Sequence, residues 1–134
     1  MSGSKSRSKG VRGEREAANY LKEIGFPDAR RRQQSQGFAS AEVECIDTLP
    51  NIHFEIKCGY ASGLGVGMAL LRNACAQAFG DCHRKEWAVL WREKGCKIWK
   101  LTTASANGIG SSTVAGDETV AETLRWLNDG GANQ

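Results

Sequence analysis

A short segment near the middle of the chain places a carboxylate and an amine on the same face of a predicted strand. Polar and apolar side chains alternate strictly through His53–Lys57. Successive side chains of a strand point to opposite faces, so Glu55 and Lys57 share one face with His53 while the residues between them enter the core. A lysine beside a carboxylate and a divalent cation can orient or deprotonate the water that attacks a phosphodiester bond. The pattern indicates phosphodiester hydrolysis, although E-x-K also arises by chance on solvated edge strands.

Two further acids face this pair if the preceding strand forms a hairpin with it. Residues 41–47 and 51–58 are both strand-like, and the segment between them contains the proline expected of a tight connection. In the register set by that turn, Glu44 lies opposite Glu55, and Glu42 lies opposite the lysine two residues further on. Hard cations such as Mg²⁺ prefer oxygen ligands, so this patch is expected to hold one.

A fourth carboxylate comes from the first predicted helix, over residues 11–24. Glu14 falls on the same helical stripe as Ala17, Ala18 and Leu21. An acid that faces inward needs a partner or a metal ion, so Glu14 is a candidate ligand. The alternative is a partly exposed helix end with a flexible glutamate.

The remaining elements give an α/β fold class with the order α-β-β-β-α-β-β-α. We expect a single domain over residues 11–128, with a central mixed sheet flanked by helices, a flexible basic arm over 1–10 and a frayed tail over 129–134. The other predicted elements are an exposed strand at 29–33, a mobile polar loop at 34–40, a glycine-rich loop at 59–67, a helix at 68–79, strands at 87–91 and 97–101, and a helix at 118–127.

Composition limits the classes of protein to which the chain can belong. With 134 residues, 40% hydrophobic and 25% charged, it fits one folded domain. No apolar run is long enough to span a membrane, and a cytoplasmic location is expected. The five cysteines include no C-x-x-C pair, so reduced thiols are expected. A partial metal site at Cys75, Cys82 and His83 is the alternative, although its spacing matches no zinc pattern.

Positive charge is concentrated at the N-terminus. Residues 1–32 carry a surplus of five positive charges, whereas the other 102 residues carry a net charge of −2. This distribution is typical of a face that binds a polyanion, and a solubilising tail is the alternative. The cations of this region are Lys5, Arg7, Lys9, Arg12, Arg15, Lys22, Arg30, Arg31 and Arg32.

An ordered series of residues resembles a known family of nucleases. The series is Lys9-Gly10, Glu14-Arg15-Glu16, Leu21, Gly25-Phe26, Arg30, an acid, and Glu55-Ile56-Lys57. It resembles the archaeal-type and phage-type Holliday junction resolvases, which are compact PD-(D/E)xK nucleases with a restriction-endonuclease-like fold. The resemblance runs from about Lys9 to Leu101, and the C-terminal helix is only loosely comparable.

The resemblance implies a metal-dependent endonuclease of DNA recombination and repair that cleaves four-way junctions as a homodimer, in the host cytoplasm if a phage encodes it. Glu14, Glu42, Glu55 and Lys57 would surround Mg²⁺ or Mn²⁺, with the three glutamates as ligands. Arg15 and Arg30 match basic positions near substrate phosphates, and Gln77 matches a polar residue beside the site. The expected DNA-binding residues are Lys5, Arg7, Lys9, Arg12, Arg15, Arg30, Arg31, Arg32 and Gln77.

The chain departs from the family at the second acid, which is normally aspartate and is Glu42 here. The added methylene can shift the metal ion, because octahedral Mg²⁺ geometry tolerates little change. Glu44 and Asp47 are rival ligands, and Asp47 reaches the site only if the hairpin slips by one residue. Two rival functions remain, namely a related nuclease acting on flaps or single-stranded ends, and a DNA-binding protein whose catalytic site has decayed.

Overall fold

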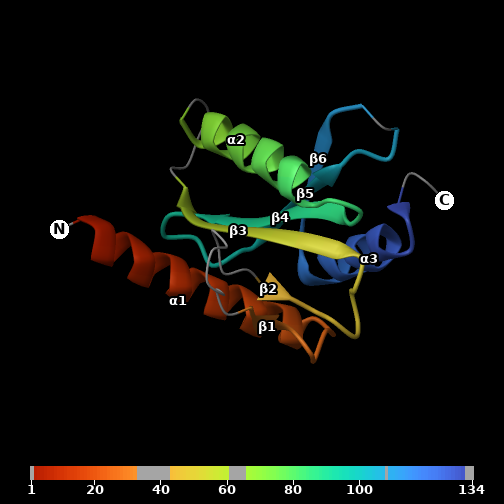
Figure 1. Cartoon of the computed structure of the whole chain (residues 1–134), viewed down its shortest axis with the longest axis horizontal. Helices are drawn as coiled ribbons and strands as arrows, with labels where there is room; N and C mark the ends of the chain where they lie inside the picture. Colours follow the sequence, from red (N-terminus) through yellow and green to blue (C-terminus); the bar gives the residue numbers. More distant parts are fainter. Residues whose placement is uncertain (1, 33–42, 61–65, 108, 132–134) are drawn as a thin grey trace.

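Three helices and six strands make up the computed structural model, which describes residues 2–32, 43–60, 66–107 and 109–131 (Figure 1). In chain order they are α1 (Ser2–Glu23), β1 (Arg30–Arg31), β2 (Val43–Glu44), β3 (Ile52–Tyr60), α2 (Val66–Asp81), β4 (Glu86–Glu93), β5 (Lys100–Ala104), β6 (Ser111–Ala115) and α3 (Asp117–Asn128). They form one α/β domain, as predicted. Among the described residues, no helix combines the length and apolar character needed to cross a bilayer.

The main sheet is mixed and has the strand order β3-β4-β5-β6. Strand β3 pairs in parallel with β4, with Glu55 beside Val89, and the other two pairings are antiparallel. A parallel pair needs a crossover connection. Helix α2, which lies between β3 and β4 in the chain, supplies it by running back along one face of the sheet (Figure 1). The C-terminal end of α2 therefore returns to the beginning of β3.

Helices cover both faces of this sheet (Figure 1). On one face, α1 and α3 pack against Phe54 and Leu90 in the larger core cluster. On the other, Leu71 and Ala78 of α2 pack against Val89. Val89 and Leu90 are adjacent in β4 and enter different clusters because successive strand residues point to opposite faces.

The predicted hairpin between residues 41–47 and 51–58 is wrong. Strand β2 pairs with β1, which places Glu44 opposite Arg30, and these two strands form a separate sheet. After Glu44 the chain leaves strand conformation and turns, with the Leu49 amide donating to the Cys45 carbonyl, so no continuous ladder reaches β3. The Arg30–Glu44 ion pair, at 3.0 Å, adds a favourable cross-strand contact to the observed pairing.

The first helix begins earlier than predicted. Helix α1 starts at Ser2, so the backbone of the segment expected to be a flexible arm is helical. Extending a helix costs far less than nucleating one, and α1 is anchored by Ala17 and Leu21, which are both fully buried. The exposed strand near residue 30 and the last helix are confirmed, with small changes in their bounds.

Strand β6 and the bounds of α2 and β5 also differ from the prediction. Strand β6 lies between the predicted strand at 97–101 and the predicted helix at 118–127, where no element was predicted. Its ladder with β5 supplies the order that its exposed Ser and Thr side chains do not. Helix α2 continues through Gly80 to Asp81, beyond the predicted end at residue 79. Strand β5 also begins at Lys100 rather than at residue 97. The predicted polar loop at 34–40 and residues 61–65 of the glycine-rich segment lie outside the described residues.

Candidate functional site

Strand β3 presents its side chains as the alternation predicted. Phe54 is buried in the larger core cluster, and Ile56 and Cys58 pack against that cluster. Glu55 therefore points to the opposite face, where its side chain is buried with only 5% of the residue exposed. A buried carboxylate is costly unless a partner or an ion compensates for its lost hydration, so the surroundings of Glu55 decide its role.

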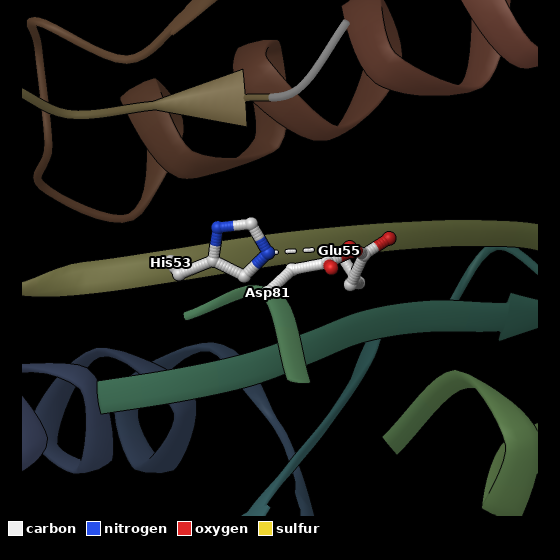
Figure 2. Close-up of side chains that lie close together, drawn as sticks. All are labelled: His53, Glu55 and Asp81. Carbon is white, nitrogen blue, oxygen red and sulfur yellow. Dashed lines mark hydrogen bonds and ion pairs between the residues drawn. The ribbon is translucent and has the colours of Figure 1, made fainter. Parts of the chain in front are cut away.

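Two side chains meet Glu55 on this face. His53 Nε2 lies 3.2 Å from Glu55 Oε1, within hydrogen-bond distance. Asp81, the last residue of α2, comes so close that one ligand atom from each of the three residues lies within 4.8 Å of the others (Figure 2). Imidazole and carboxylate groups at this spacing can hold a metal ion.

Asp81 was not predicted from the sequence. A signal for it existed, because α2 has 16 residues and so spans about 24 Å. Strand β3 has nine residues and spans about 30 Å, so a helix that runs back along it ends near the first residues of the strand. Asp81 would then have been expected beside His53, which the alternation places on the same face of the strand as Glu55 and Lys57.

Glu14 approaches the site from α1. It accepts a hydrogen bond from Arg31 Nε at 2.8 Å. Partial burial raises the pKa of Glu14 above its usual value, and repulsion from Glu55 adds to this shift, whereas Arg31 and Lys57 oppose it. The helix acid therefore lies within electrostatic range of both members of the E-x-K pair, and its direct partner is Arg31.

The rival acids of the predicted hairpin are distributed differently. Glu44 is paired with Arg30 and lines a small cavity beside His53, so it does not stand opposite Glu55 as expected. Asp47 is exposed, and its backbone amide donates to Asp28 Oδ2 at 2.6 Å. Glu42 lies outside the described residues.

The predicted DNA-binding residues fall into three groups. Arg30 and Arg31 form ion pairs with Glu44 and Glu14, respectively. Exposed positions are held by Arg12, Arg15, Arg32 and Gln77. The side chains of Lys5, Arg7 and Lys9 lie outside the described part of the chain, although their backbone belongs to α1.

The alternative metal site at the cysteines is not formed. All five cysteines are free thiols. Cys82 is buried, and its thiol donates to the Phe79 carbonyl oxygen at 3.2 Å. Within the described ranges, the cluster of His53, Glu55 and Asp81 is the one group of side chains close enough together to hold an ion.

A groove of about 690 Å³ opens where α1 passes the end of β3 and the connection between β4 and β5. We call it the α1–β4 groove. Its lining residues are Arg12, Gly13, Glu16, Cys58, Gly59, Arg92, Glu93, Lys94, Gly95, Cys96 and Lys97.

Charge in the α1–β4 groove is not balanced. Arg92 pairs with Glu16 and lies 4.5 Å from the centre of the Trp99 ring, and Lys100 pairs with Glu93. In the part of the chain that the structure describes, no carboxylate forms an ion pair with the lining cations Arg12, Lys94 and Lys97. The groove therefore carries a positive surplus next to the residues that follow Lys57.

Comparison with known proteins returns no relative, since no protein-family model, curated protein or solved structure matches the chain.

Proposed function

We propose that the chain is a metal-dependent DNA endonuclease whose active site is centred on Glu55 and Lys57. The observation that carries the proposal is that Glu14 of α1 lies within electrostatic range of both Glu55 and Lys57 of β3, although the helix and the strand are far apart in the sequence. A carboxylate pair with an adjacent lysine supplies the parts that hydrolysis of a phosphodiester needs.

The donor set fits a hard divalent cation. Glu55 is buried, and Glu14 is partly buried and feels its repulsion, so the two acids would both gain from a cation held between them. Glu14 and Glu55, with Glu42 as the proposed third ligand, would hold Mg²⁺ or Mn²⁺. A bound cation would stabilise the charge that develops on the scissile phosphate.

Lys57 would then act on the attacking water, and neighbouring side chains would hold the two acids in place. Lys57 projects from the same face of β3 as Glu55, and its amine would orient the attacking water or accept its proton. Glu55 would be held in place by His53, which lies within hydrogen-bond distance of its carboxylate. Arg31 holds Glu14 in the same way from β1.

DNA is the substrate that the charge distribution favours. The N-terminal residues 1–32, which include Arg12, carry five surplus positive charges, and Lys94 and Lys97 add two cations of the α1–β4 groove that form no ion pair with a described carboxylate. Contacts of this kind bind phosphates without reading sequence. We further propose that the DNA is a four-way junction cleaved by a homodimer, because paired symmetric nicks need two active sites.

One observation favours a second candidate, a DNA-binding protein without catalysis. Glu14 is hydrogen-bonded to Arg31, which competes with a cation for the same carboxylate. Glu42 is a second reason, because it stands where the Holliday junction resolvases normally have aspartate and its added methylene can shift the metal ion. Such a protein would bind junctions and leave them intact in Mn²⁺.

Cleavage of labelled DNA tests the proposal. The wild-type chain should nick four-way junctions in symmetric pairs in Mg²⁺ or Mn²⁺, and flaps, single-stranded ends and duplexes in the same panel would reveal another substrate. Glu55→Gln and Lys57→Ala should each abolish cleavage and leave DNA affinity within a few-fold. Glu122→Gln, at an exposed position of α3, is the matched control and should cleave normally. Turnover by either active-site variant would contradict the assignment.

The second acid has its own test. Glu42→Asp should preserve or raise activity, because the shorter side chain restores the ligand usual in this type of site. Full activity of Glu42→Ala would instead mean that Glu44 or Asp47 takes its place.

A further inference from the structure

The cluster of His53, Glu55 and Asp81 has the composition of a metal site in its own right. We propose that these three side chains bind a divalent ion that accepts a nitrogen ligand, of the Mn²⁺ or Zn²⁺ class, beside the cation of the proposed active site. Glu55 would be shared between the two positions. The inference rests on the proposed function only for this neighbouring cation, since binding at the cluster needs no DNA.

The spacing of the cluster suits an ion. Ligand atoms around Zn²⁺ lie about 2.0–2.2 Å from the metal, so two of them are separated by about 3.4 Å in a tetrahedral site and by about 4.2 Å at most. The three ligand atoms here lie within 4.8 Å of one another. Closing a tetrahedral site would shorten the longest of these separations by up to about 1.4 Å, shared between two side chains. Figure 2 shows the three side chains converging from β3 and α2.

The electrostatics of the cluster also favour a cation. Two carboxylates share a small volume, and that of Glu55 is almost completely buried. Asp81 ends α2, where the partial negative charge of the helix terminus adds to its own, and the last turn contains no basic residue to offset it. Among the described residues, no lysine or arginine forms an ion pair with Glu55 or Asp81.

The nitrogen donor determines which ion the cluster prefers. Mg²⁺ is best served by oxygen ligands and water, whereas imidazole suits transition metals. His53 contributes one imidazole nitrogen and the two acids contribute oxygen, which is a mixed set suited to Mn²⁺ or Zn²⁺. Arg32 and Lys85 line the small cavity beside His53, so a phosphate could approach a bound ion from that side.

Mn²⁺ binding to the full chain without DNA tests the inference. Calorimetric titration should show a Mn²⁺ site that Mg²⁺ displaces poorly, and electron spin resonance of bound Mn²⁺ should show coupling to a nitrogen nucleus. Asp81→Asn and His53→Gln should each weaken Mn²⁺ binding by at least about tenfold, because loss even of a ligand's supporting partner costs that much. His53→Gln should also remove the nitrogen coupling.

Glu14→Gln serves as the control, because it removes an acid of the proposed active site and leaves the cluster intact. It should keep the nitrogen-coupled Mn²⁺. Asp81 is exposed, so Asp81→Asn should fold even if the His53 variant does not. Tight Mn²⁺ binding that survives both cluster substitutions, or that is lost in Glu14→Gln alone, would overturn the inference, and the latter result would support the proposed active site. Nitrogen-coupled binding in a chain that cleaves no DNA would uphold the cluster and refute the nuclease.

Discussion

Removing the two lysines of the α1–β4 groove should make DNA binding less sensitive to salt. Lys94 and Lys97 lie in the connection between β4 and β5, are exposed, and have no carboxylate partner among the described residues. If DNA follows the groove, each lysine displaces a counterion from the backbone when it meets a phosphate. The double variant Lys94→Ala/Lys97→Ala would lose both displacements.

The magnitude follows from counterion release. Each phosphate contact contributes about 0.9 to the negative slope of log affinity against log salt, so the double variant should flatten that slope by about 1.8. Over a fourfold rise in salt, the wild-type affinity would therefore fall by about twelvefold more than that of the variant. Chemistry on bound DNA should not change, because neither lysine belongs to the proposed active site.

Fluorescence anisotropy with a labelled four-way junction measures the slopes. A salt range of about 50 to 200 mM is a fourfold rise, over which the expected difference in affinity change is about twelvefold. Lys97→Ala alone should flatten the slope by about 0.9, half of the change expected for the double variant. Lys22→Ala is the matched control, since it removes one exposed lysine of α1 that does not line the groove. Single-turnover cleavage at saturating enzyme completes the comparison. Parallel slopes for the double variant and the wild type would refute the proposed path of the DNA.

Three further results are expected. Asp28 accepts hydrogen bonds from the Asp47 amide and from Thr48. Burial alone would raise the pKa of Asp28, but these hydrogen bonds together outweigh it and lower the pKa below the usual 3.8. Asp28→Asn should therefore reduce the free energy of unfolding at neutral pH by about 1 kcal/mol. The difference should shrink as pH falls below about 3.8, where the Asp28 carboxyl of the unfolded chain begins to take up a proton, and through the lower pKa of the folded protein. A pH-independent difference in urea unfolding would contradict this origin. Burial raises the pKa of the Cys45 thiol to about 12, so a thiol reagent at pH 8 should leave Cys45 unmodified until the chain unfolds, as peptide mass mapping would reveal. Deletion of residues 1–8, which removes Lys5 and Arg7, should flatten the salt slope by up to about two without slowing cleavage at saturation, and an unchanged slope would mean that these residues do not contact DNA.

Local sequence patterns were sufficient to predict which side chains of a single strand or helix face the core. The alternation around Glu55 correctly separated the core side chains, such as Phe54, from the polar face. Helical periodicity likewise identified α3 and the inward-facing position of Glu14. These features are decided by the periods of the strand and the helix, which each segment carries in its own sequence.

The choice of strand partner could not be read in the same way. Residues near Glu44 were predicted to pair with the strand that follows them, whereas the structure pairs them with β1, the strand that precedes them. Strand β6 was missed for a related reason, because its order comes from the ladder with β5 rather than from its own exposed side chains. Pairing is a long-range choice that depends on which edges remain available after the core has formed.

The sequence by itself therefore determined which side chains of β3 could do chemistry, and the tertiary structure decided what they meet. Asp81 joins His53 and Glu55 because β3 and β4 are parallel, which obliges α2 to run back and end beside the first residues of β3. Arg31 reaches Glu14 because β1 lies against α1. Neither contact has a local signature, since each joins residues that only the packing of separate elements brings within a few ångströms.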